Sequence, residues 1–184
     1  MSLAYCPTRA IFDVETTRID NPYNAPISCI SIIVGNPPEI YQFEEEDVRE
    51  AVKILLASPG LVTYNGRKFD VPVMLKYMSR GEGRRLRLKP HFDPLFEIQQ
   101  QRPGLLVSLD NMCKETLGIA KQDLGDESPI NLAKYNIPQL LRYNAYDSYL
   151  TYLLWNYMCS FGKLYYKMPT RTEFVPDTIS RTTR

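Results

Sequence analysis

The pattern of apolar and polar positions in the first third of the chain predicts three β-strands. Residues 10–16 (AIFDVET) place apolar side chains on both faces and polar side chains toward the carboxyl end. This pattern is typical of a central strand whose end emerges at the edge of a sheet. The β-branched run at 27–35 and the shorter run at 39–43 are separated by a proline-containing turn. These two runs therefore predict a β-hairpin.

Beyond residue 44, helical spacing of apolar residues alternates with short strands and loops. The spacing predicts helices over 47–57, 69–81, about 94–101, 108–118 and 136–159, a short buried strand over 61–65, a basic loop after residue 81 and a polar loop over 119–135. Strands followed by such alternation indicate an α/β fold, with a mixed β-sheet flanked by α-helices.

The composition is that of an ordinary globular domain, because 44% of the 184 residues are hydrophobic and 23% are charged. No segment approaches the ~18 apolar residues of a membrane span, and the first residues contain no apolar signal core, so we expect a cytoplasmic protein without membrane contact. The four cysteines form no CxxC pair, and we expect buried thiols. We assign residues 1–162 to a single domain and residues 163–184 to a basic C-terminal tail, a candidate for an extended or disordered segment.

The charges balance over the whole chain but not locally. The chain has 22 Lys and Arg against 21 Asp and Glu, a net charge of +1. Residues 76–91 nevertheless carry six Lys and Arg against one acid, and the tail is also basic. Such stretches favour contact with phosphates, and Arg84 and Arg85 are candidate nucleic-acid-binding residues. A solvated surface without a partner explains them equally well.

Acidic residues occur where the fold alone does not require them. Asp13 and Glu15 lie two residues apart, so both side chains project from the same face of the first strand. Asp147 lies in an apolar stripe of the last helix, one turn after Tyr143, where an unpaired buried carboxylate is costly. Asp70 begins a helix after a short strand, at the edge where catalytic residues of open α/β sheets gather. The structural alternatives are acids that reach water at a strand end, a local ion pair and a plain helix cap.

Brought to one edge of the sheet, these four carboxylates repel one another, and divalent cations are the natural means of neutralising them. Oxygen ligands of this kind favour Mg²⁺ or Mn²⁺ over zinc. Two such ions about 3.5–4 Å apart can activate a water and stabilise the leaving oxygen during phosphodiester cleavage. The acids therefore predict a two-metal site that acts on a phosphate substrate.

Three motifs occur in the order and spacing of a known enzyme family. They are Phe12-Asp13-Val14-Glu15-Thr16, then Tyr64-Asn65-Gly66 with Phe69-Asp70-Val71-Pro72, and finally Tyr143-x-x-x-Asp147. From about residue 10 to residue 159 the chain resembles the DEDD superfamily of DnaQ-like 3′–5′ exonucleases, which have a ribonuclease H-like fold. A tyrosine four positions before the last aspartate matches the tyrosine branch, DEDDy. The likeness is greatest to the exonuclease domains of family B DNA polymerases and their stand-alone relatives.

The resemblance implies a role for each residue of the acidic set. Asp13, Glu15 and Asp147 would hold two divalent ions, Mg²⁺ or Mn²⁺, and Asp70 would contribute through one ion or its bound waters. Tyr143 would orient the attacking water. Since the ordinary pKa of tyrosine is about 10, metal-bound water must supply most of the nucleophile.

The resemblance also implies the substrate, a nucleic acid shortened from its 3′ end to nucleoside 5′-monophosphates. Single-stranded DNA is favoured, and the alternative is an exoribonuclease on the same fold. Thr16, Asn65 and Phe69 would position the strand end, although structural roles explain Asn65 and Phe69 equally well. A polymerase or repair partner would act in trans. A non-catalytic nucleic-acid-binding protein is the alternative of another class, and the presence of all four acids disfavours it.

Overall fold

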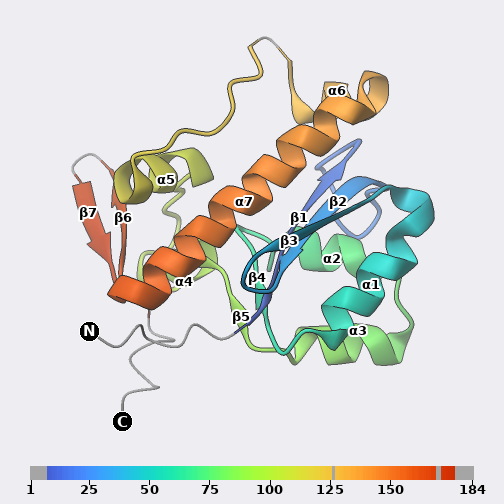
Figure 1. Cartoon of the computed structure of the whole chain (residues 1–184), viewed down its shortest axis with the longest axis horizontal. Helices are drawn as coiled ribbons and strands as arrows, with labels where there is room; N and C mark the ends of the chain where they lie inside the picture. Colours follow the sequence, from blue (N-terminus) through green and yellow to red (C-terminus); the bar gives the residue numbers. More distant parts are fainter. Residues whose placement is uncertain (1–7, 126, 169–170, 177–184) are drawn as a thin grey trace.

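The computed structural model describes residues 8–125, 127–168 and 171–176, and its centre is a five-stranded mixed sheet (Figure 1). The strands are β1 Ala10–Thr16, β2 Ile27–Val34, β3 Glu39–Phe43, β4 Leu61–Val62 and β5 His91–Phe92. They run in the order β3-β2-β1-β4-β5 across the sheet. β2 is antiparallel to both of its neighbours, whereas β1, β4 and β5 are parallel. The predicted α/β class and mixed sheet are confirmed.

Each face of the sheet is covered by its own set of helices. The first set is α1 Val48–Ala57, preceded by the short 3₁₀ turn η1 Glu45–Asp47, with α2 Asp70–Leu75 and α3 Arg80–Arg87. The second set is α4 Pro94–Gln101, α5 Leu109–Leu117, α6 Pro129–Tyr135 and α7 Ile137–Phe161. β1 serves both layers because its side chains alternate: Phe12 and Val14 pack with the first set and Ile11 with the second. In Figure 1 the long α7 crosses in front of the sheet.

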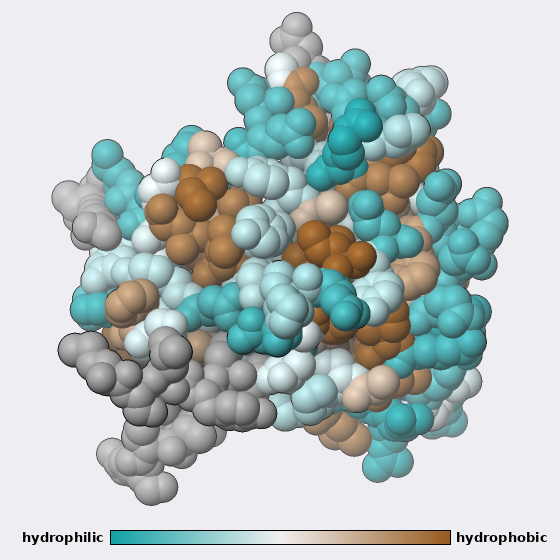
Figure 2. Space-filling view, viewed as in Figure 1, coloured by the Kyte–Doolittle hydropathy of each residue, from teal (hydrophilic) through white to brown (hydrophobic). Residues whose placement is uncertain are grey.

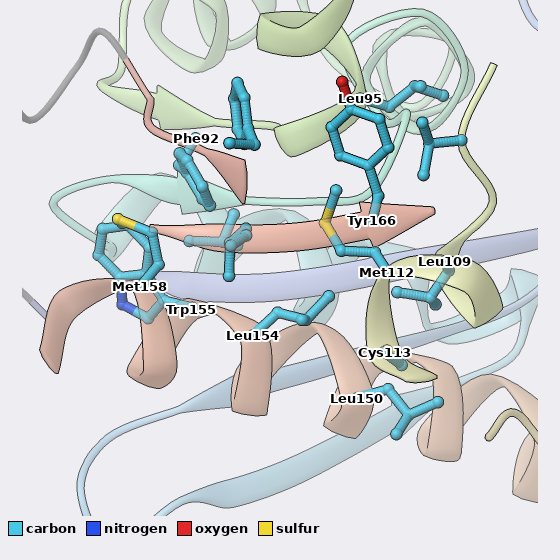
Figure 3. Close-up of a cluster of buried hydrophobic side chains, with 14 of the residues drawn as sticks. Phe92, Leu95, Leu109, Met112, Cys113, Leu150, Leu154, Trp155, Met158 and Tyr166 are labelled. Carbon is cyan, nitrogen blue, oxygen red and sulfur yellow. The ribbon is translucent and has the colours of Figure 1, made fainter. Parts of the chain in front are cut away.

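A hydrophobic cluster anchors α7 to the sheet (Figure 3). The rings of Phe92 on β5 and Trp155 on α7 have centroids 5.2 Å apart and planes inclined by 47°. Leu154 and Met158 of α7 and Met112 of α5 are buried around them. Each fully buried side chain of this kind contributes roughly 1.5–3 kcal/mol, so the cluster fixes how α7 lies across β1.

The basic segment is helical, which corrects the predicted loop after residue 81. The expected helix over 69–81 ends early, and α3 begins after Ser79. The Ser79 hydroxyl accepts a hydrogen bond from the Glu82 amide, and the Glu82 carboxylate accepts one from the Ser79 amide at 2.8 Å. This capping box starts a new helix, and its Ser-x-x-Glu signature was present in the sequence. A second correction is α6, which lies within the predicted polar loop and is capped by Ser128.

After residue 162, the described residues 163–168 and 171–176 are folded. The expectation of an extended or disordered tail is therefore wrong for this part, while residues 177–184 lie outside the described ones. β6 Leu164–Lys167 and β7 Arg171–Phe174 form an antiparallel hairpin. Leu164, Tyr166 and Phe174 are buried in the cluster of Figure 3. Their burial explains why the hairpin forms, because its apolar face covers α5.

The cysteines match the expectation in part. Cys29 and Cys113 are free and buried, as predicted. Cys159 is disulfide-bonded, which corrects the expectation of four thiols, and Cys6 lies outside the described residues. Cysteines far apart in sequence give no local signal of pairing, so spacing alone missed this bond.

On the face shown in Figure 2, hydrophobic side chains form separate patches divided by hydrophilic ones. Exposed large hydrophobic residues of the molecule include Ile40, Tyr149 and Phe161. No helix within the described ranges is both long enough and apolar enough to span a membrane.

Candidate active site

Two acids of β1 point toward α7. Asp13 and Glu15 share the face of β1 that carries Ile11, as their spacing of two predicts. Both side chains are half-buried. Carboxylate oxygens of Asp13, Glu15 and Asp147, one from each residue, all lie within 4.8 Å of one another. The structure therefore brings three of the four predicted acids into one cluster.

Asp147 lies on the buried stripe of α7 and is itself only 4% exposed. Its Oδ2 is ion-paired with Nζ of Lys121, whereas its Oδ1 is buried without a hydrogen-bond partner among the described residues. An unpaired buried carboxylate oxygen is costly, so this atom is available to a ligand. The other members of the predicted stripe are also buried, which confirms it: Leu140, Tyr143, Leu150 and Leu154.

Asn144 connects α7 to β1. Its Nδ2 donates a hydrogen bond of 2.6 Å to Oδ2 of Asp13, and the side chain is fully buried. This residue was not among the predicted site residues. Its spacing of three from Asp147 was a usable signal, because residues three apart lie on the same face of a helix.

Asp70 supports the cluster from the β4 side of β1. The Val14 amide faces that side, because amides alternate along a strand and the Ala10 amide bonds there to the Gly60 carbonyl. β4 ends at Val62, so it does not reach Val14, and the Val14 amide instead donates a 2.7 Å hydrogen bond to Oδ1 of Asp70. Asp70 is 3% exposed and lies outside the three-carboxylate group found among the described residues. A plain helix cap does not account for this contact across the fold.

The loop between β4 and α2 is held rigidly beside the acids. Asn65 has a positive φ of 65°. At Gly66 a Cβ atom would lie 2.5 Å from the Thr63 side chain, so only glycine fits this turn. The Asp93 carboxylate accepts hydrogen bonds of 2.9 Å from the amides of both Asn65 and Arg67. The loop that begins α2, and with it Asp70, is thereby tied to the end of β5.

The four acids all hold protons more tightly than usual. Burial, followed by the charge of Asp147, raises the pKa of Asp13 to about 7. Burial raises the pKa of Glu15 and of Asp70 well above the usual range, and the charge of Asp13 adds to both effects. Burial also raises the pKa of Asp147, although Lys121 opposes the shift. The common cause of the four shifts is burial, and the like charges of neighbouring acids add to it at Asp13, Glu15 and Asp70.

Lys121 is the cation of the cluster, and the sequence did not reveal it. Its ammonium group pairs with Asp147 and donates a 2.7 Å hydrogen bond to the hydroxyl of Tyr143. Burial lowers the pKa of Lys121, but the Asp147 charge and the hydrogen bonds to Asp147 and Tyr143 outweigh it, so the pKa is raised. Burial and the Asp147 charge raise the pKa of Tyr143 to about 12 despite Lys121. Asp110 holds the loop in place by accepting a 2.9 Å hydrogen bond from the Lys121 amide.

The predicted nucleotide contacts lie around the cluster in different environments. Thr16 is 2% exposed, and its hydroxyl donates a 2.6 Å hydrogen bond to the Arg18 carbonyl. Asn65 is exposed at the turn of the loop. Phe69 is half-buried against the core of the first helix set. Asn65 is therefore the most accessible of these three side chains.

Arg84 and Arg85 are exposed on α3, which lies near the amino end of β5. α3 leads into the start of β5, and the ammonium group of Lys89 there bonds to the Leu56 carbonyl at 3.0 Å. The acids lie at the carboxyl end of β1, which runs parallel to β4 and β5. The structure does not bring these two arginines to the acidic cluster.

The donor set of the cluster fits a divalent metal. Its ligand atoms are carboxylate oxygens, which Mg²⁺ and Mn²⁺ prefer. Asp147 also has one carboxylate oxygen, Oδ1, that is buried without a hydrogen-bond partner in the described part of the chain. Lys121 supplies a positive charge beside three carboxylates, and the charge of a neighbouring acid adds to burial in raising the pKa of Asp13 and Glu15. The residues that would hold a metal are Asp13, Glu15 and Asp147.

Comparison with known proteins agrees with this fold. The chain aligns with a family B DNA polymerase from the hyperthermophilic archaeon Pyrobaculum calidifontis with a TM-score of 0.62 and 18% sequence identity. The alignment covers 83% of this chain but only 24% of the polymerase chain. None of the curated proteins compared with the sequence matches it. The model of the RNase_H superfamily matches residues 10–159, and the chain therefore belongs to the RNase_H superfamily.

Proposed function

We propose that this chain is a metal-dependent 3′–5′ exonuclease that shortens single-stranded nucleic acid, DNA in preference to RNA, and releases nucleoside 5′-monophosphates. The observation that carries the proposal is the cluster of Asp13, Glu15 and Asp147, whose oxygens lie within 4.8 Å of one another beside an unpaired Oδ1 of Asp147. A ribonuclease H-like fold and the proximity of the three carboxylates both support a phosphodiesterase that works with divalent cations.

Asp13, Glu15 and Asp147 would hold two ions, Mg²⁺ or Mn²⁺. Bound there, such ions lower the pKa of a water and neutralise charge on the leaving oxygen. Asp70 fixes the backbone of β1 between Asp13 and Glu15 through the Val14 amide, so that both carboxylates keep their direction.

Tyr143 and Lys121 complete the proposed site. With a pKa of about 12, the Tyr143 hydroxyl keeps its proton at neutral pH, so it orients the attacking water and does not act as the base. Lys121 fixes the direction of that hydroxyl and adds positive charge beside the phosphate that is attacked. Asn65, at the loop turn, and the half-buried Phe69 are proposed to contact the terminal nucleotide.

The test is cleavage of a single-stranded DNA oligonucleotide labelled at its 5′ end, with Mg²⁺, with Mn²⁺ and with EDTA, beside an RNA of the same sequence. We expect a metal-dependent ladder that shortens from the 3′ end. Asp13→Asn should reduce the rate at least a hundredfold, whereas the exposed control Glu46→Gln should leave it unchanged.

Binding of both strands without cleavage by either metal would exclude the proposed activity and favour a non-catalytic nucleic-acid-binding protein. Shortening of the RNA alone would reassign the substrate and leave the mechanism standing. Cleavage that persists in Asp13→Asn would place the reaction elsewhere in the molecule.

A further inference from the structure

A cavity whose lining contains none of the clustered acids lies between α2, α3 and the start of β5. Its volume is about 270 Å³, close to the lower end of the ~300–1,000 Å³ typical of small-ligand sites. Two guanidinium groups, the rings of Tyr23 and Phe96 and the imidazole of His91 line it, together with aliphatic side chains of α2 and α3. None of the lining residues is acidic. The residues that define its chemistry are Arg67, Arg87, Tyr23 and Phe96.

Arg67 is already oriented for a ligand. Its guanidinium group donates a hydrogen bond to the His91 carbonyl, and its central carbon lies 4.8 Å from the centre of the Phe96 ring. A guanidinium group has five N–H donors, so donors remain for an anion. Burial and the charges of Arg67 and Arg9 hold the pKa of His91 at about 3, so the positive charge of the pocket comes from its arginines.

Arg87 supplies the second positive charge from the end of α3. Its side chain is exposed and makes no ion pair or side-chain hydrogen bond within the described ranges. Glu82 is the acid of α3, and it is already paired with Arg49 at 2.9 Å. The basic segment singled out in the sequence thus meets a cavity through Arg87.

Tyr23 supplies an accessible ring at the mouth of the cavity, since the residue is 59% exposed. Its loop, residues 17–26, is held by internal hydrogen bonds. The Tyr23 amide donates to Oδ1 of Asn21 at 3.0 Å, and the Arg18 guanidinium group donates to the Asn24 carbonyl at 2.9 Å. The ring is therefore presented on an ordered turn, next to an apolar wall.

We propose that this cavity binds one nucleotide unit, with its phosphate between Arg67 and Arg87 and its base against Tyr23. Paired guanidinium groups recognise phosphate oxygens, and an accessible aromatic ring stacks on a base. Arg67 lies three residues before Asp70 in the loop that also serves the acidic cluster. The choice of a nucleotide over other organic anions rests on the proposed function. The unit is either a free nucleoside monophosphate or part of the strand that enters the active site, and the chemistry is the same.

The test measures binding in EDTA, where the metal-free acids repel anions and no cleavage occurs. The full chain is titrated by calorimetry with dAMP, a twelve-residue oligothymidylate, deoxyadenosine and inorganic phosphate. The variants are Arg87→Gln and Tyr23→Ala, with Arg80→Gln as the control, because Arg80 is an exposed arginine of the same helix that does not line the cavity. Thermal melting shows whether each variant is folded.

We expect Arg87→Gln to weaken binding at least tenfold and Tyr23→Ala at least fivefold, with Arg80→Gln within twofold of the wild type. If the variants lose affinity for dAMP, the ligand of the cavity is a free mononucleotide. If they lose affinity for the oligonucleotide alone, the ligand is a nucleotide unit of the strand. The proposal is overturned if neither dAMP nor the oligonucleotide binds, if Arg80→Gln weakens binding as much as Arg87→Gln, or if phosphate alone binds as tightly as dAMP. Because cleavage in Mg²⁺ tests the proposed function separately, the two failures are distinguishable.

Discussion

The ammonium group of Lys121 donates a 2.7 Å hydrogen bond to the hydroxyl of Tyr143 while it is ion-paired with Asp147. A residue of an irregular loop thus joins two residues one turn apart on α7. Tyr143 and Asp147 define the last motif of the chain, and Lys121 contacts both and opposes the rise in pKa that burial causes at each.

We expect Lys121→Gln to slow the metal-dependent shortening of DNA about ten- to a hundredfold, because a positioned donor beside the reacting phosphate is lost. The variant also leaves Asp147 without its cation, which should lower the free energy of unfolding by about 1–3 kcal/mol in EDTA. Single-turnover cleavage and urea unfolding measure the two effects. The control is Lys114→Gln, whose lysine pairs with Asp110 at the surface. Equal cleavage rates for the two variants would show that Lys121 does not contribute to the reaction.

Asp13→Asn should stabilise the metal-free protein at alkaline pH. The folded state raises the pKa of Asp13 from an ordinary 3.8 to about 7. Between these values the folded state binds more protons than the unfolded state, so the free energy of unfolding falls as pH rises. The destabilisation is complete above pH 7, and the variant lacks it.

Urea unfolding in EDTA should therefore give a higher midpoint for Asp13→Asn than for the wild type at pH 8, with a smaller difference at pH 4.5. Excess Mg²⁺ at pH 8 should raise the wild-type midpoint, because a ligand of the folded state stabilises it, and should raise that of Asp13→Asn much less. A wild type that is more stable than the variant at pH 8 without metal would contradict the predicted repulsion.

Asp93→Asn should loosen the loop beside the acids. The carboxylate accepts hydrogen bonds from the amides of Asn65, Arg67 and Phe96, and an amide side chain has only one accepting oxygen. We expect a loss of about 1–3 kcal/mol in the free energy of unfolding. The loosened loop should also disturb its proposed contact with the terminal nucleotide. We therefore expect the variant to raise KM more than it lowers kcat. Asp123→Asn, which alters an exposed turn acid, is the control. An unchanged KM would show that this loop does not contribute to substrate binding.

His91 should make the protein less stable in mild acid. Burial and the charges of Arg67 and Arg9 lower the pKa of His91 from 6.5 to about 3. Between these values the unfolded state binds the extra proton, so stability is full above pH 6.5 and falls as pH drops. From pH 7.5 to pH 5 the wild type should lose about 2 kcal/mol more than His91→Gln, measured by urea unfolding. Parallel pH profiles for the two proteins would show that folding does not lower the pKa of His91, and would contradict this prediction.

The sequence alone determined the features that depend on local periodicity. The alternation of β1 placed Asp13 and Glu15 on one face, and the spacing of three and four placed Tyr143 and Asp147 on the buried stripe of α7. Helix and strand geometry fixes these relations within a few residues, so no knowledge of distant contacts was needed. The same periodicity indicated the mixed sheet and its covering helices.

Only the tertiary structure revealed the contacts between distant residues that no motif predicted. The bond from the Val14 amide to Asp70 and the pairing of Lys121 with Asp147 join segments that share no repeating pattern. The hairpin of β6 and β7 was missed because its short strands are defined by the core they cover. Such contacts depend on how packed layers bring loops and strand ends together, a property of the whole chain that local spacing does not encode.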